Sequence, residues 1–135
     1  MNRPQIIIVD NNLSFRQCLK NLFTVENIAS VIGEASNDIE FMDVLTKNKP
    51  DLVLMSFPLD PKNRTAMMKK ALLYMPDLKI IAFTMFGNEE SRAGMIELGV
   101  KGFLQKSCYI DEYIKAFYFV TKGENYFSNK RDTFN

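Results

Sequence analysis

Histidine and tryptophan are both absent from this sequence of 135 residues. Without histidine the chain cannot build a Ser-His or Cys-His catalytic pair, a histidine-ligated metal site or a phosphohistidine. Cysteine is scarce as well, with only Cys18 and Cys108 and no Cys-x-x-Cys motif. Two isolated cysteines are not a disulfide framework and fit a reducing compartment. We therefore expect both to be small, buried or half-buried side chains.

Long apolar runs are missing too. The first apolar run, residues 6–9, is too short for the core of a signal peptide, and no segment approaches the length of a membrane span. The charge is nearly balanced, with 17 Lys and Arg against 16 Asp and Glu. This balance argues against a surface built to bind nucleic acid or an anionic membrane. We expect a cytoplasmic chain that itself binds neither.

The apolar residues that are present, 47% of the chain, suffice for the core of one domain. Continuous apolar runs, typical of parallel strands covered on both faces, lie at 6–9, 52–55 and 80–83, with weaker strand candidates at 29–35 and 102–105. Apolar residues at helical spacing lie between and after these runs, at 15–23, 41–45, 68–75, 88–98 and 110–121.

This alternation of strand and helix predicts an α/β fold. Right-handed crossovers favour a flavodoxin-like, doubly wound, five-stranded parallel sheet with helices on both faces. We assign residues 1–125 to this domain and residues 126–135 to a C-terminal tail or linker stub, because the last segment is polar.

Polar side chains follow the predicted strands at the edge where α/β sheets carry their sites. They are Asp10, Asn11, Ser56, Thr84 and Lys106. Together they could hold an oxyanion or a hydrated cation weakly, or simply satisfy one another. They make a poor catalytic set, because Ser56 has no histidine and Lys106 could act as a base only if desolvated.

Four motifs in this order, IIIVDNN, PDLVLMS, KIIAFTM and GVKGFLQKS, resemble the receiver domain of two-component response regulators from residue 5 to about residue 125. The last motif and the later KGENYFS are most similar to receivers that precede a helix-turn-helix DNA-binding domain. The resemblance implies phosphoryl transfer from a histidine kinase to an aspartate at the end of the third strand. It also implies Mg²⁺ held by that aspartate and by an acidic pair after the first strand.

Carried over by this resemblance, Asp10 is the first acid of the pair, Thr84 the switch hydroxyl, Lys106 the phosphoryl-contacting lysine and Phe103 the switch aromatic. The chain departs from the family elsewhere. Asn11 replaces the second acid, Ser56 occupies the phosphoacceptor position, and the loop at 57–64 lacks the usual glycine. A single engineered change at position 56 would not alter Asn11 or this loop, so we interpret the departures as natural.

These departures change the chemistry that the site can support. A serine hydroxyl, unlike a carboxylate, needs an activating base, and none is evident. The three-carboxylate site of the family would carry a charge of about −3, whereas Asp10 alone leaves about −1. We therefore expect weak or absent Mg²⁺ binding at Asp10 and no other cofactor. We hypothesise a direct Asp10–Lys106 ion pair, with Ser56 or Asn11 hydrogen-bonded to it, and expect Phe103 to be a core residue rather than a switch.

Three functions remain open from the sequence. The first is a degenerate receiver that acts by protein–protein interaction, as the regulatory part of a transcription factor for example. The second is a receiver still phosphorylated at a non-standard residue, Ser56 or Asp60. The third is a small enzyme or flavin carrier on the same fold, although the loop after residue 10 has no glycine to approach a phosphate and no GxGxxG motif is present.

The expected partners are a protein or a second copy of the chain, together with a sensor kinase. The resemblance implies a contact surface on the face formed by segments 88–98, 102–105 and 110–122, which often mediates dimers in the family, with the first and fifth helices as the alternative. Aromatic residues nearly surround the last of these helices, which is typical of a helix buried on two sides.

Overall fold

The computed structural model describes residues 3–57, 64–85, 89–106 and 108–128 of the chain. Strands and helices alternate along it, as the apolar patterns predict. The elements are β1 (Gln5–Val9), α1 (Leu13–Val25), β2 (Ser30–Ala35), α2 (Asp38–Thr46), β3 (Leu52–Ser56), α3 (Arg64–Tyr74), β4 (Ile80–Thr84), α4 (Glu89–Leu98), β5 (Gly102–Gln105), α5 (Ile110–Thr121) and β6 (Tyr126–Phe127).

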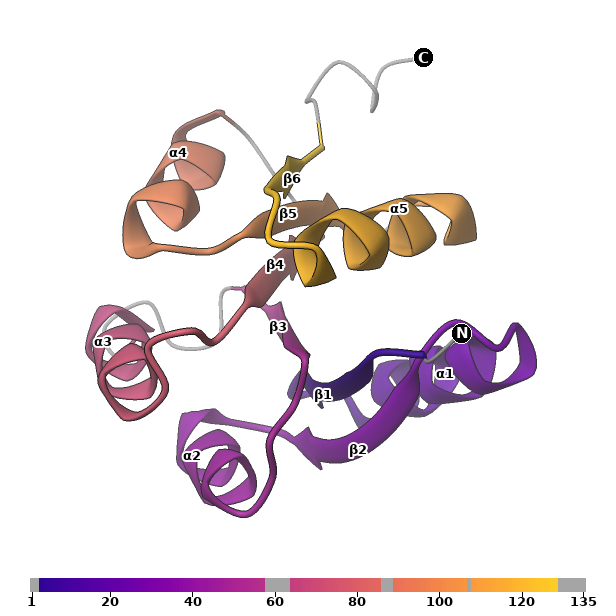
Figure 1. Cartoon of the computed structure of the whole chain (residues 1–135), viewed down its shortest axis with the longest axis horizontal. Helices are drawn as coiled ribbons and strands as arrows, with labels where there is room; N and C mark the ends of the chain where they lie inside the picture. Colours follow the sequence, from indigo (N-terminus) through magenta and orange to yellow (C-terminus); the bar gives the residue numbers. More distant parts are fainter. Residues whose placement is uncertain (1–2, 58–63, 86–88, 107, 129–135) are drawn as a thin grey trace.

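The strands form one parallel sheet in the order β2-β1-β3-β4-β5-β6 (Figure 1). The doubly wound parallel arrangement is confirmed, but the expected five-stranded sheet gains a sixth strand among the described residues. This strand, β6, lies within the segment that we assigned to the tail. It was missed because two residues in a polar context show no apolar run, and backbone pairing with β5 alone defines them.

Helices cover both faces of the sheet, α1 and α5 on one side and α2, α3 and α4 on the other (Figure 1). Successive strand residues serve opposite layers, because side chains alternate along a strand. Ile6 and Ile8 pack with α1 and α5, whereas Ile7 and Val9 pack with the other three helices. All four are fully buried, which explains why this strand reads as an unbroken apolar run.

Asparagine side chains start the first two helices. Asn12 Oδ1 accepts the N–H of Phe15 at 3.0 Å, and Asn37 Oδ1 accepts the N–H of Glu40 at 2.8 Å. The spacing of Asn37 and Glu40 is that of a capping box, in which Glu40 would accept the N–H of Asn37, but its carboxylate accepts the backbone N–H of Ser36 instead, at 2.9 Å. That bond, together with the Ser36 hydroxyl, lowers the pKa of Glu40.

The two cysteines differ in exposure. Cys108 is half-buried as expected, whereas Cys18 is exposed and our expectation for it was wrong. Cys18 lies on α1 beside Leu19, but only Leu19 and Phe23 of that helix are buried, so the apolar stripe is narrower than the sequence indicates. Among the described residues, no helix has the length and hydropathy needed to span a membrane.

Candidate functional site

Four of the predicted site residues end neighbouring strands at one edge of the sheet. Val9 pairs with Met55, so the residues that follow them in the chain, Asp10 and Ser56, come side by side at the ends of β1 and β3. Thr84 ends β4, and its carbonyl accepts the backbone N–H of Lys106 at 2.7 Å. Parallel pairing therefore brings these side chains to the same edge, as the sequence predicts.

The predicted ion pair between Asp10 and Lys106 is present. Lys106 Nζ lies 2.6 Å from Asp10 Oδ2, with the Asp10 side chain fully buried and the Lys106 side chain 13% exposed. The other carboxylate oxygen, Oδ1, accepts the backbone N–H of Asn12 at 2.8 Å. We expected Ser56 or Asn11 in this role. The backbone of the loop supplies the donor instead, because Asn11 is exposed and the loop turns back over Asp10.

Two phenyl rings complete the surroundings of the Lys106 ammonium. Its Nζ lies 4.7 Å from the ring centroid of Phe15 and 5.2 Å from that of Phe83. The two rings stack with centroids 5.7 Å apart and planes 22° apart. A carboxylate and two aromatic faces thus lie around the Lys106 side-chain nitrogen, and each of them attracts positive charge. The sequence carries no signal for this contact, because Phe15 and Phe83 belong to different elements.

Arg16 ties the loop after β1 to the neighbouring strand. Its Nη1 donates to the carbonyl of Asp10 at 2.5 Å, and its Nε lies 3.2 Å from the carboxylate of Glu34 on β2. Lys20 reaches the same carboxylate at 3.4 Å. This network fixes the backbone of Asp10, and therefore the position from which its side chain meets Lys106. The sequence reasoning did not identify Arg16 or Glu34.

The remaining predicted residues are enclosed. Ser56 and Thr84 are 5% and 7% exposed, and Phe103 is 2% exposed within the core on the α2–α4 side of the sheet. Phe103 thus packs as a core residue in this structure. Asp60, the alternative modification site, lies outside the described residues.

The surroundings of Asp10 do not fit a divalent cation. One carboxylate oxygen faces the Lys106 ammonium and the other accepts a backbone N–H, so a metal ion would have to displace both. Within residues 3–57, 64–85, 89–106 and 108–128, no three histidine, cysteine or acidic side chains are grouped so that they could hold a metal ion. Among the described strand ends, Asp10 is thus the carboxylate that Mg²⁺, which prefers oxygen ligands, would meet.

Two groups between α1, α5 and the sheet have altered acidity. Burial raises the pKa of the Cys108 thiol to about 12, with a further contribution from the Glu112 carboxylate. Burial also raises the pKa of Tyr113 well above its usual range. Both groups are therefore neutral at physiological pH, and Cys108 is not a reactive thiol.

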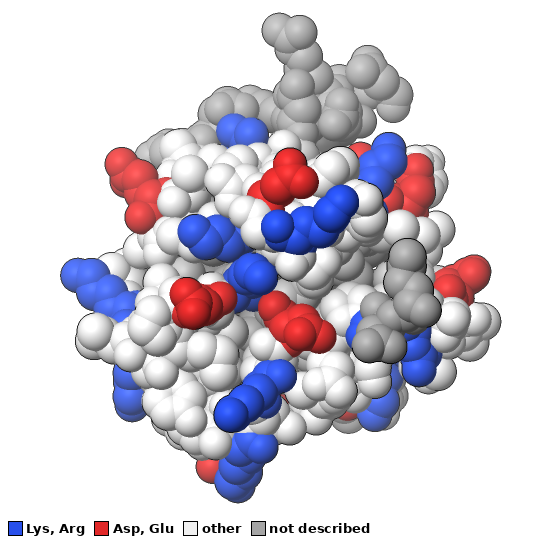
Figure 2. All heavy atoms as spheres, in the orientation of Figure 1, with Lys and Arg blue, Asp and Glu red and all other residues white. Residues whose placement is uncertain are grey.

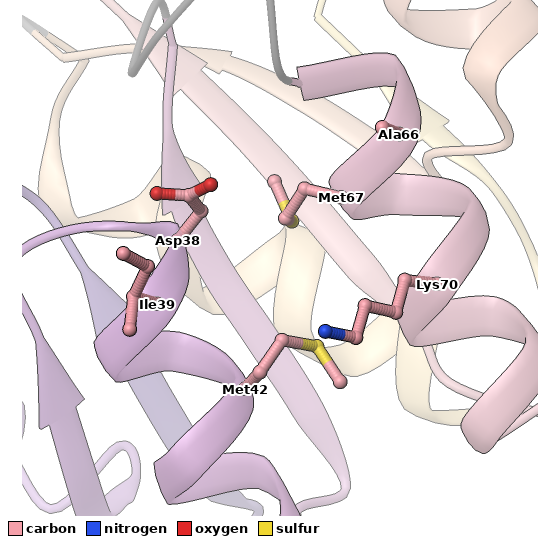
Figure 3. Close-up of a pocket in the computed structure, with 6 residues that line it drawn as sticks. All are labelled: Asp38, Ile39, Met42, Ala66, Met67 and Lys70. Carbon is pink, nitrogen blue, oxygen red and sulfur yellow. The ribbon is translucent and has the colours of Figure 1, made fainter.

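A separate groove of about 260 Å³ lies between α2 and α3 (Figure 3). Its lining is Asp38, Ile39, Met42, Ala66, Met67 and Lys70. Lys70 extends across the groove toward Met42, as Figure 3 shows. None of the predicted site residues lines this groove, so it is distinct from the cluster around Asp10.

The chain matches the family model "Response regulator receiver domain" over residues 6–118. A similar protein is the "Uncharacterized transcriptional regulatory protein YhcZ" of Bacillus subtilis, 30% identical over 112 residues that cover 83% of this chain and 52% of YhcZ. Another is the "Transcriptional regulatory protein DegU" of Brevibacillus brevis, 24% identical over 96% of this chain and 55% of DegU. The chain thus spans about half the length of these relatives.

Solved structures show the same fold. A LuxR-family two-component response regulator from Aurantimonas superimposes with a TM-score of 0.87 at 20% identity, over 98% of this chain and 94% of that one. The isolated REC domain of RcsB from Salmonella enterica superimposes with a TM-score of 0.82 at 18% identity, over 98% of each chain. The relatives named above are regulators of transcription and not enzymes. With the family match over most of its length, the chain belongs to the response regulator receiver domain family.

Proposed function

We propose that this receiver domain acts in signal transduction through protein–protein contacts, without ordinary aspartyl phosphorylation. The observation that carries the proposal is the buried Asp10–Lys106 ion pair, 2.6 Å long. In the chemistry that the family implies, Asp10 would hold Mg²⁺ and Lys106 would contact a phosphoryl group. Here these two side chains form an ion pair with each other instead.

The phosphoacceptor position supports the same proposal. Ser56 is 5% exposed and needs a base to become a nucleophile. Lys106 Nζ is already engaged by the Asp10 carboxylate and the two phenyl rings, so it is not directed at the Ser56 hydroxyl as a base. Asp10 is itself neutralised by Lys106. Neither charged residue of the site is therefore available to take the hydroxyl proton.

The electrostatic balance of the site supports weak or absent Mg²⁺ binding. Asp10 and Lys106 together carry a net charge of about zero, so the site attracts a divalent cation far less than a cluster of carboxylates would. The pair also resists opening, because separating two buried charges leaves each without its partner.

We further propose that the longer protein is a transcription regulator, whose DNA contacts lie outside this chain. The relatives named above are transcriptional regulatory proteins, and one solved relative is RcsB "bound to promoter rprA". On the face in Figure 2, basic and acidic side chains alternate with neutral ones and no patch of one sign stands out. On this face, the mixture of charges supports a protein partner, either a second copy of the chain or a sensor kinase, rather than nucleic acid. We propose that the receiver acts in the cytoplasm.

The decisive experiment measures the melting temperature across a Mg²⁺ series, with and without beryllofluoride, the phosphoryl mimic for this family. We expect no shift for the wild type. The matched control is the Asn11→Asp/Ser56→Asp variant, which restores the carboxylates that the family uses. A ligand at 100 times its Kd stabilises the folded state by about 2.7 kcal/mol. For a domain of this size, that raises the melting temperature by roughly 8–11 °C, which is the shift expected for the control variant.

A Mg²⁺-dependent shift of the wild type, enlarged by beryllofluoride, would refute the proposal. The alternative function, a receiver that is phosphorylated at Ser56 or Asp60, would then be the better explanation. Mass spectrometry of the modified chain would identify which residue carries the phosphoryl group.

A further inference from the structure

The chain continues beyond α5 to cover the outer edge of β5. Tyr126 and Phe127 of β6 pair with Gly102 and Phe103 in parallel register, at the end of the sheet between α4 and α5 (Figure 1). Beside this ladder, the N–H of Tyr126 donates to the carbonyl of Lys101, and the N–H of Ser128 donates to the carbonyl of Phe103, both at 2.9 Å. A Cβ at Gly102 would lie 3.2 Å from the Tyr126 carbonyl oxygen, so the two backbones approach closely.

Side chains from both flanking helices hold this segment. On α4, the guanidinium of Arg92 lies 5.7 Å from the ring centroid of Phe127, and its Nε donates to the carbonyl of Ser128 at 3.2 Å. On α5, the ring of Phe119 stacks on Tyr126 with centroids 6.1 Å and planes 9° apart. The Tyr126 hydroxyl donates to the Glu112 carboxylate. Residues 126–128 therefore connect α4 to α5 across β5.

We propose that residues 126–128 are a strap that closes the face formed by α4, β5 and α5, and that this face receives a second copy of the chain only when the strap detaches. The inference rests on the proposed function, in which the domain acts through protein contacts. It also modifies the surface expected from the sequence, because the edge of β5 within that surface is occupied by the chain itself.

A strap this short can detach without unfolding the domain. Its strand spans two residues, and its side chains are half-buried rather than part of the closed core. The preceding residues 122–125 are all exposed, so detachment of the segment breaks only the half-buried contacts that Tyr126 and Phe127 make with the two core layers. Local opening of this kind is expected where few buried apolar contacts hold a segment.

Charge on the uncovered face favours a second copy as the occupant. Detachment frees Arg92 on α4 and Glu112 on α5, which are opposite in charge and lie on the two sides of β5. In a two-fold dimer each residue of such a pair can meet its opposite on the other copy. The carbonyls of Lys101 and Phe103 also lose their partners, and an uncovered strand edge favours pairing with another chain.

The test loosens the strap with Tyr126→Ala/Phe127→Ala. The matched control is Leu73→Ala/Tyr74→Ala, which removes two exposed apolar side chains from α3. Backbone amide exchange at position 128 reports the seating of the strap, and sedimentation equilibrium reports self-association. For the loosened variant we expect at least tenfold faster exchange and at least tenfold tighter dimerisation. We expect neither change in the control, and unchanged circular dichroism in both.

Charge exchange tests the identity of the occupant. In the loosened variant, adding Arg92→Glu should return self-association to the wild-type level, and adding Glu112→Arg as well should restore the dimer. Faster exchange without tighter dimerisation would overturn the inference, as would unchanged exchange or a dimer insensitive to Arg92→Glu. These assays use no Mg²⁺ or beryllofluoride, so their outcome is independent of the thermal-shift test of the proposed function.

Discussion

Replacing Lys106 with methionine probes the buried ion pair most directly. Methionine keeps an apolar side chain near the rings of Phe15 and Phe83 but removes the ammonium that faces Asp10. The fully buried Asp10 carboxylate would keep only the backbone N–H of Asn12 as a partner. Removing one partner of a buried ion pair costs about 3–5 kcal/mol, because the remaining charge is uncompensated. We expect a loss of this size in the free energy of unfolding at pH 7.

The double variant Asp10→Asn/Lys106→Met separates charge from packing. Asparagine preserves an oxygen for the N–H of Asn12 and carries no charge, so the penalty for an unpaired carboxylate disappears. What remains is the lost attraction between the ammonium and the two rings, about 1–2 kcal/mol, and the burial of a neutral amide N–H, which costs less than the burial of an unpaired carboxylate. The double variant should therefore be more stable than Lys106→Met alone.

Urea unfolding followed by circular dichroism measures these differences, provided that the m-values agree. Lys47→Met is the matched control, because Lys47 pairs with Asp43 at 3.2 Å on the surface, where the two side chains are 69% and 65% exposed. Such a pair contributes at most about 0.5 kcal/mol. The reasoning fails if Lys106→Met is no more destabilising than this control, or if the double variant is as unstable as Lys106→Met.

Two further predictions concern a pair of glycines and a pair of cysteines. Gly99 has φ +102° after α4, so Gly99→Ala should cost about 1–2 kcal/mol in urea unfolding. Gly94→Ala, inside α4 with open space around the added methyl, should instead stabilise the fold by about 0.5–1 kcal/mol. Equal changes in stability for the two variants would contradict the positive φ at Gly99. Because burial raises the pKa of Cys108 to about 12, its thiolate is scarce at pH 8 and becomes abundant only as pH rises toward that value. Peptide mapping after iodoacetamide treatment at pH 8 should find the exposed Cys18 alkylated first, and the reverse order would show that Cys108 is more accessible than its burial indicates.

Local patterns account for most of the fold. Strands such as β1 and β3 are buried on both faces, so their unbroken apolar runs identify them, and helical spacing identifies α1 and α5 between and after such runs. The strand β6 cannot be predicted from local patterns, because its partner β5 and the side chains that hold it come from distant parts of the chain.

The candidate site was predictable for a different reason. Parallel topology brings strand ends together, and charge balance then favours Asp10 with Lys106. The contacts of Lys106 with Phe15 and Phe83, and the link from Arg16 to Glu34, could not be predicted in this way. They depend on how a helix lies over the sheet, which neither the strand order nor the composition determines.

The buried Asp10–Lys106 pair also has an evolutionary consequence. A carboxylate introduced first at position 56, where Ser56 is 5% exposed, would add a negative charge beside a lysine that is already neutralised. At position 11 the side chain is exposed, and a carboxylate there is solvated at little cost. Stepwise mutation toward an acidic edge therefore costs less folding stability when position 11 changes before position 56.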